Sequence, residues 1–141
     1  MSETHSINTG TCLCGAVAYE ISGNLGLFQY CHCSRCRKVT GSAFAANLFV
    51  APTQFKWTQG EDKVGRYELE NAKHFASSFC TQCGSNLPWL TQTGRAVVVP
   101  AGTLNEALNI EPKANTFYAS RAPWEKCVSE LPAFDELSVK S

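Results

Sequence analysis

The sequence predicts a mainly β protein of many short antiparallel strands with one or two short helices. Short apolar and β-branched runs alternate with turn residues along almost the whole chain, while helical periodicity is scarce. A chain of 141 residues is one domain by length and encloses a modest core. It also holds eight cysteines, most of them in closely spaced groups, which in a cytosolic protein favours a metal over disulfides.

Turn residues delimit the predicted elements. The run AVAYEIS lies between Gly15 and Gly23, and SAFAANLFV stops before Pro52. Short helices are expected at 34–39, with Ser34 as the N-cap, and at 123–127, with Pro123 near the start. Residues 105–112 are expected to form a polar loop. Strands are expected at residues 16–22, 27–31, 42–50, 66–70, 74–79, 87–90, 96–99 and 117–119.

Composition excludes several classes of protein. The chain is 44% hydrophobic with a formal net charge of zero, so we expect a globular protein without a nucleic-acid partner. Its apolar runs are too short to span a bilayer, and its first ten residues lack the features of a secretory signal. We therefore expect a cytoplasmic protein without a membrane partner. No linker divides the chain, which predicts an N-terminal arm at 1–9, one domain at 10–135 and a tail at 136–141.

The motif CTQCG predicts a zinc knuckle. Cys80 and Cys83 are three residues apart and are followed by Gly84, which permits a positive φ and lets its amide approach a sulfur atom. Cys12 and Cys14 are two apart, so both sulfur atoms face the same side of an extended backbone. Together the two pairs supply four thiolates, which is the composition of a closed, structural zinc site.

The stretch CHCSRCRKVTG, residues 31–41, predicts a second and different metal site. Cys31, Cys33 and Cys36 supply three thiolates from one continuous segment. Three protein ligands and one open position are typical of a catalytic zinc. His32 lies between two of these cysteines on a strand-like segment, so its side chain is expected to point away from them.

Another pairing fits the same spacings. Cys33 and Cys36 could share a metal with the knuckle cysteines, which would leave Cys12, Cys14 and Cys31 without partners. The sequence by itself leaves this alternative open.

Several motifs in order give the chain a resemblance to a known family. The segments CLCG, CHCSRCRKVTGSAF, FCTQCGSNL, AGTL, ASRAPW and LPAF, which extend from about Gly10 to Phe134, resemble the glutathione-dependent formaldehyde-activating enzyme (GFA) and centromere protein V domain family. The resemblance implies a β-tent fold. It also implies two Zn²⁺ ions per chain, a structural one on Cys12, Cys14, Cys80 and Cys83 and a catalytic one on Cys31, Cys33 and Cys36. Family members often carry histidine before the SRAPW motif, where this chain has Asn115, Thr116 and Phe117.

The resemblance implies a carbon–sulfur lyase activity on a thiol–aldehyde adduct of the S-hydroxymethylglutathione type. The expected partners are a small thiol such as glutathione and an aldehyde such as formaldehyde. An open three-thiolate zinc suits this chemistry, because a soft substrate thiol matches the fourth position and remains nucleophilic as a thiolate. The alternative is a binding or structural module in which both zinc ions only stabilise the fold, as would follow if Cys127 filled the open position.

Six further side chains are candidates for substrate binding. The cations beside the cysteines could hold substrate carboxylates, although they could equally offset thiolate charge or face solvent. A serine after the cluster could donate to an oxyanion, and the SRAPW motif could line the same pocket. The candidates are Arg35, Arg37, Lys38, Ser42, Arg121 and Trp124.

Overall fold

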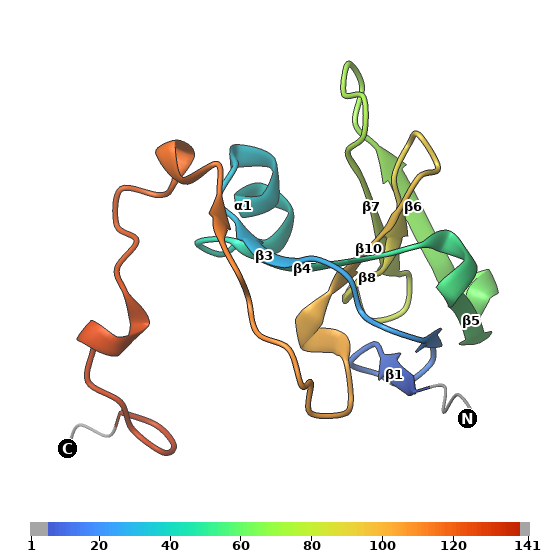
Figure 1. The fold of residues 1–141 in the computed structure, drawn as a ribbon, viewed down its shortest axis with the longest axis horizontal. Coiled ribbons are helices and arrows are strands. Elements are labelled where there is room, and N and C mark those ends of the chain that lie inside the picture. The colour runs from blue at the N-terminus through green and yellow to red at the C-terminus, as the bar shows by residue number, and fades with distance from the viewer. Residues whose placement is uncertain (1–5, 139–141) are drawn as a thin grey trace.

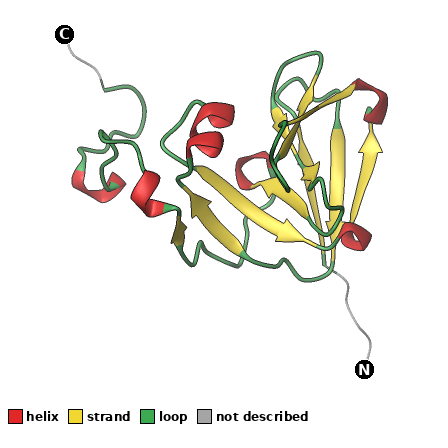
Figure 2. Ribbon diagram, turned by 90° about the horizontal axis from the view of Figure 1, so that it is seen from above, coloured by secondary structure: helices red, strands yellow, loops and turns green. Residues whose placement is uncertain are grey.

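Three β-sheets form the body of the protein (Figure 1, Figure 2). A computed structural model describes residues 6–138 of the chain. The outer parts of the predicted arm and tail, residues 1–5 and 139–141, lie outside the described residues, and the domain limits at 10 and 135 stay a prediction. The predicted mainly β class is confirmed.

Each sheet has its own strand order. The first sheet has the order β1-β2-β5, with β1 at Ile7–Thr11, β2 at Ala18–Ser22 and β5 at Phe55–Gln59. The second has the order β11-β3-β4-β10-β9, with β11 at Asn115–Thr116, β3 at Phe28–Cys31, β4 at Ala45–Val50, β10 at Val97–Pro100 and β9 at Trp89–Leu90. The third has the order β6-β7-β8, with β6 at Val64–Glu68, β7 at Ala76–Cys80 and β8 at Asn86–Leu87. Among these strands β11 and β3 pair in parallel, and the other pairs are antiparallel.

The predicted strands agree with the structure apart from one error and three omissions, which are β1, β5 and the two-residue β11. Strands β1 and β5 were not predicted, because their sequences INTGT and FKWTQ are too polar for a clear apolar run. The strand predicted at 117–119 is wrong. Phe117 adopts a left-handed conformation with φ of 53°, which ends β11 at Thr116 and begins a 3₁₀ turn instead.

Helix α1, at Ser34–Thr40, follows β3 directly and carries the middle cysteines. Its N-cap is Cys33 and not the predicted Ser34, because the backbone N–H of Cys36 donates to the Cys33 Sγ at 3.3 Å. The helix ends at Gly41, whose φ of 65° closes its last turn.

The helix predicted at 123–127 is wrong, since that segment forms a turn. Short 3₁₀ turns lie at η1 (Pro52–Gln54), η2 (Glu61–Lys63), η3 (Ala101–Thr103), η4 (Tyr118–Ser120) and η5 (Val128–Glu130). The predicted loop at 105–112 has no helix or strand.

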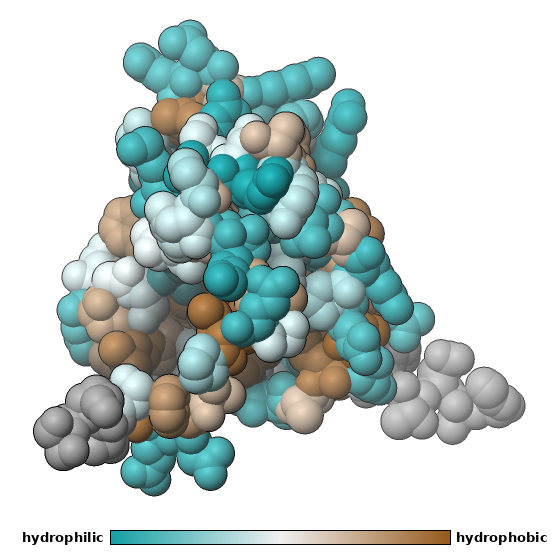
Figure 3. Space-filling model, turned by 90° about the vertical axis from the view of Figure 1, so that its left-hand side faces the viewer, coloured by the Kyte–Doolittle hydropathy of each residue, from teal (hydrophilic) through white to brown (hydrophobic). Residues whose placement is uncertain are grey.

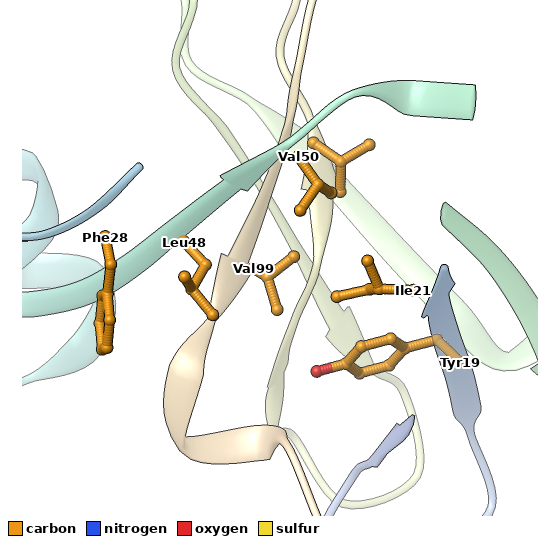
Figure 4. Close-up of a cluster of buried hydrophobic side chains, with 7 residues drawn as sticks. Tyr19, Ile21, Phe28, Leu48, Val50 and Val99 are labelled. Carbon is orange, nitrogen blue, oxygen red and sulfur yellow. The ribbon is translucent and has the colours of Figure 1, made fainter. Parts of the chain in front are cut away.

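The main core lies between the first and second sheets (Figure 4). Its buried members are Tyr19, Ile21, Phe28, Leu48, Val50, Val97 and Val99. Burial raises the pKa of Tyr19 to about 12. The hydroxyl of Tyr19 donates to Thr103 Oγ1 at 2.6 Å, which in turn donates to the carbonyl of Pro100 at 2.8 Å. The one polar atom of this ring therefore has a partner inside the core.

The C-terminal segment, residues 121–138, extends away from the sheets (Figure 1). Its large apolar side chains are exposed, among them Trp124, Val128, Leu131, Phe134 and Leu137. Figure 3 views the side of the molecule that carries this segment, where hydrophilic side chains cover the upper part and apolar groups gather below. Within the described part of the chain, no helix has the length and apolar character to cross a membrane.

The close approach of Gly10 to Tyr19 gives a test of the core. The two residues are directly opposed in the β1–β2 pair, and a methyl group at position 10 would overlap the Tyr19 ring. We expect Gly10→Ala to lower the free energy of unfolding by about 2 kcal/mol, because the overlap displaces a buried ring. Urea unfolding of the metal-loaded protein measures this.

Gly102→Ala is the matched control, since a methyl group there would meet no atom within 4 Å. Its unfolding midpoint should stay close to that of the unmodified protein. Equal midpoints for the two variants would contradict the packing described for Tyr19.

Candidate metal centres

Four cysteines from two distant segments meet at the first centre. Cys12 and Cys14 flank the turn after β1, while Cys80 and Cys83 form the turn after β7, and all four sulfur atoms lie within 4.8 Å of one another. The Sγ atoms of Cys12 and Cys14 are 3.7 Å apart, and those of Cys14 and Cys80 are 3.9 Å apart. Tetrahedral zinc with bonds of about 2.3 Å requires sulfur separations of about 3.8 Å. The donor set and its spacing therefore fit zinc.

Backbone amides direct the sulfur atoms of this four-cysteine cluster. The N–H of Val17 donates to Cys12 Sγ at 3.3 Å, and the N–H groups of Gln82 and Cys83 donate to Cys80 Sγ at 3.3 and 3.4 Å. Such donors stabilise thiolate charge. Gly84 has the predicted positive φ, at 80°. Its amide, however, donates to the carbonyl of Cys80 at 2.7 Å and not to a sulfur atom.

The hydroxyl of Ser85 adds another donor to the same cluster. It lies 3.2 Å from Cys83 Sγ, and its hydrogen bond lowers the pKa of Cys83 to about 5. A thiolate at neutral pH is the form that binds a metal ion.

Cys31, Cys33 and Cys36 form the second centre, a three-cysteine cluster whose sulfur atoms also lie within 4.8 Å of one another. Cys31 is the last residue of β3, Cys33 caps α1 and Cys36 lies in the first helical turn. The change from strand to helix at this point turns the three side chains toward one place. The alternative pairing of Cys33 and Cys36 with the knuckle is not found, because Cys80 and Cys83 meet Cys12 and Cys14.

His32 points away from the three-cysteine cluster, as the strand alternation predicts. It is buried, its ring lies 5.1 Å from that of Phe44 and 5.0 Å from that of Tyr118, and its Nε2 lies 2.8 Å from Oδ1 of Asn115. Since an amide oxygen accepts, Nε2 carries the proton. His32 thereby connects the segment that carries the cluster to β11, through Asn115, and to the turn after it, through Tyr118.

In the metal-free chain the Cys36 thiol donates a hydrogen bond to Cys31. This bond lowers the pKa of Cys31 to about 5 and raises the pKa of Cys36 well above its usual range. At neutral pH the cluster therefore holds a thiolate on Cys31 and a proton on Cys36. The side-chain amide of Asn47 also points at Cys36 Sγ, with Nδ2 at 4.0 Å.

A cavity of about 300 Å³ lies beside the three-cysteine cluster, and all three of its cysteines line the cavity. Asn47 lines it as well, from β4. Sequence reasoning missed Asn47, although an asparagine inside the apolar run SAFAANLFV was a usable signal, because asparagine is depleted in strands.

The six predicted substrate-binding residues do not all lie at the cavity. Arg35 lines the cavity, whereas the other five are absent from its walls. Arg37 is half-buried on α1, and Lys38 is exposed in the last helical turn. A cation at this end of a helix is stabilised by the negative end of the helix dipole. Ser42 is exposed, and its backbone N–H donates to Thr40 Oγ1 at 3.2 Å.

The two candidates from the SRAPW motif lie further along the chain. The guanidinium of Arg121 stacks 4.3 Å from the centre of the Tyr118 ring and donates to the Tyr118 carbonyl at 2.9 Å. Trp124 is 68% exposed. Cys127 is also exposed, and its Sγ lies 3.1 Å from the Ser129 hydroxyl.

Fold and clusters together define a mainly β domain with two cysteine sites that could hold metal ions. The chain belongs to the glutathione-dependent formaldehyde-activating enzyme (GFA) family, whose model matches residues 7–120. A crystal structure of a Rhodobacter sphaeroides protein is similar in fold, with a TM-score of 0.59 and 23% sequence identity. The similarity covers 77% of this chain and 99% of that one.

The proton on Cys36 leads to a prediction about pH. A metal ion that enters the three-cysteine cluster must displace this proton, because only the thiolate binds. Lower pH returns the proton, so the affinity of this site for Zn²⁺ should rise with pH, by about tenfold per pH unit for each proton displaced. Calorimetric Zn²⁺ titrations of metal-free protein at pH 6 to 8, in buffers of different ionisation enthalpy, count the protons released.

A Cys36→Ser variant is the control for this titration, because it lacks the thiol that holds the proton. It should release fewer protons in total than the unmodified chain. Proton release that is identical in the two proteins would contradict the assignment of the proton to Cys36.

Proposed function

We propose that this protein is a zinc-dependent enzyme of the carbon–sulfur lyase type, which forms or breaks a thiol–aldehyde adduct at the three-cysteine cluster. The observation that carries the proposal is the position of this cluster, whose three thiol groups line a cavity large enough for a small molecule. No fourth side-chain ligand joins them among residues 6–138. The family description supports glutathione and formaldehyde as the first pair to test.

The two clusters have different roles in this proposal. The four-cysteine cluster holds one Zn²⁺ with a complete set of protein ligands and stabilises the fold. The three-cysteine cluster holds the second Zn²⁺. When bound there, zinc supplies a soft Lewis acid that favours the deprotonated form of a substrate thiol at neutral pH.

The reaction adds the thiol to the aldehyde. A carbon–sulfur bond forms between the thiol sulfur and the carbonyl carbon, while the π pair of the carbonyl moves to its oxygen. The proton lost by the thiol is returned to that oxygen, which gives an S-hydroxymethyl product. The reverse direction breaks the same carbon–sulfur bond. The cavity contributes by holding both reactants in contact, which removes much of the entropic cost of a bimolecular step.

The side chains on the cavity wall have assignable tasks. Arg35 lies at the wall beside the cysteines and is placed to contact a substrate carboxylate. The buried amide of Asn47 directs its Nδ2 toward Cys36 Sγ, at 4.0 Å, and would donate to this sulfur once it is a metal-bound thiolate. Of the six residues predicted to bind the substrate, we propose a substrate contact for Arg35 alone.

A purely structural role for the second metal would require a further protein ligand. The sequence candidate was Cys127, but this residue is exposed and bonds to Ser129 in the C-terminal segment. Its position supports the enzyme over the structural module. A cytoplasmic location is part of the proposal, since none of the eight cysteines, all within residues 6–138, forms a disulfide, and a reducing compartment keeps cysteines in this form.

The test of the function is exchange NMR on formaldehyde, glutathione and their adduct, with and without zinc-loaded protein. We expect the protein to accelerate exchange between free and adduct carbon, and Cys36→Ser to abolish the acceleration. The folded state of the variant is checked by its amide spectrum. Unchanged exchange in the presence of protein that carries both zinc ions would refute the activity with this pair.

Metal content separates the two clusters. Native mass spectrometry should find two Zn²⁺ in the unmodified chain and one in Cys36→Ser, which keeps its fold. Cys80→Ser should lose the ion of the four-cysteine cluster and unfold at a lower urea concentration. Its free energy of unfolding should fall by about several kcal/mol, because the free energy of metal binding contributes to the stability of the folded state. Equal loss of stability in the two variants would contradict the division into a structural and a catalytic site.

A further inference from the structure

Four phenylalanine and tryptophan rings make up much of the cavity wall, beside the three cysteines. Phe49 reaches it from β4, Phe75 from the segment before β7, Trp89 from β9 and Phe117 from the turn after β11. The ring centres of Phe75 and Trp89 are 5.3 Å apart, with the planes tilted by 46°. Such a wall favours an apolar, flat group next to the sulfur atoms.

Phe117 is the unusual member of this wall. Its side chain is 67% exposed, and its backbone is in the left-handed region, with φ of 53° and ψ of 39°. Bulky residues rarely adopt this conformation, and an exposed ring recovers little packing energy in return. Two backbone hydrogen bonds hold the position, from His32 to the carbonyl of Thr116 at 2.9 Å and from Ser120 to that of Phe117 at 3.0 Å. Backbone strain of this kind is common where a side chain holds a ligand, so Phe117 is a candidate ligand contact.

The remaining charged side chains of the cavity wall are cations or a histidine. Arg35, Lys73 and His74 line it, and no aspartate or glutamate does so among the described residues. Gln92 fixes the turn that carries Lys73 and His74, since its backbone N–H donates to the His74 carbonyl at 2.9 Å and its Nε2 to the Phe75 carbonyl at 2.6 Å. The backbone that carries Lys73 and His74 is therefore held in place at the cavity, and cationic side chains there suit a carboxylate.

We infer that the preferred thiol is aromatic and carries a carboxylate. Its sulfur lies toward the three cysteines, its ring contacts Phe117 and Trp89, and its carboxylate meets Arg35 and Lys73. Glutathione fits this chemistry less well. It offers carboxylates to the cations but no ring to the aromatic wall, and its ammonium group has no acidic partner on the wall.

This inference rests on the proposed function and specifies its thiol. The addition to an aldehyde is unchanged: the aromatic thiol forms the carbon–sulfur bond to the carbonyl carbon, and its proton ends on the carbonyl oxygen. What changes is the order of preference among thiols.

Calorimetric binding to the zinc-loaded full chain tests the inference without any measure of turnover. The probes are 4-(mercaptomethyl)benzoate, benzyl mercaptan and glutathione. We expect 4-(mercaptomethyl)benzoate to bind about tenfold more tightly than glutathione, from its ring contacts and its charged hydrogen bonds together. Phe117→Ala should weaken its binding about fivefold, which is the size of one aromatic contact.

Two further variants locate the contacts. Phe134→Ala, which removes a ring of 59% exposure from the C-terminal segment, should leave binding unchanged. Lys73→Gln should weaken the binding of 4-(mercaptomethyl)benzoate severalfold. The binding of benzyl mercaptan should stay unchanged, because this thiol has no carboxylate. Because Phe117 and Lys73 are both exposed, neither variant is expected to disturb the fold.

The outcomes separate this inference from the proposed function. Glutathione that binds as tightly as the aromatic thiol, or a Phe117→Ala variant with unchanged affinities, would overturn the inference even where formaldehyde–glutathione exchange is accelerated. Aromatic preference that depends on Phe117 supports the inference even where that exchange is not accelerated, and the proposed function is then judged with the aromatic thiol and formaldehyde.

Discussion

The four-cysteine cluster is the constraint on which the rest of this structure depends. It joins the turn after β1 to the turn after β7, so that sulfur atoms 66 residues apart in the chain lie 3.9 Å from each other. Around it, Val17 and Leu87 are buried against Cys12 and Cys80 and form a small core of their own. This core fixes the third sheet against the first, in a chain too short to do so with a large apolar interior.

The cluster also influences the proposed site, although it lies outside it. Strand β7 ends at Cys80, and the segment that leads into it carries His74 and Phe75, which line the cavity. Any displacement of the third sheet therefore moves part of the cavity wall relative to β3 and α1. The four-cysteine cluster and the cavity beside the three-cysteine cluster are linked here through one strand. We infer that this linkage holds His74 and Phe75 in a defined position relative to β3 and α1.

The three-cysteine cluster is local by contrast. A strand that ends at Cys31 and a helix that begins at Ser34 place three thiols in six residues, and the sulfur of Cys33 serves as the helix cap. His32, on the other side of the backbone, connects this segment to Asn115. The thiols are thus positioned by local geometry, whereas the cavity beside them is assembled from β4, β9, β10, the segment before β7 and the turn after β11.

The sequence alone determined the mainly β class, the two cysteine clusters and the family, because cysteine spacing and turn residues act over a few positions. It predicted a group of four cysteines and a group of three, but a second pairing also fitted the spacings until the structure placed Cys80 beside Cys14. Only the tertiary structure decided which side chains face the open cluster. Asn47, Trp89 and Phe117 are distant from Cys31 in the sequence, and Phe117 reaches the cavity because the residue before it, Thr116, pairs with Cys31 in β3. No periodicity within one segment contains that information, since it arises from contacts between segments.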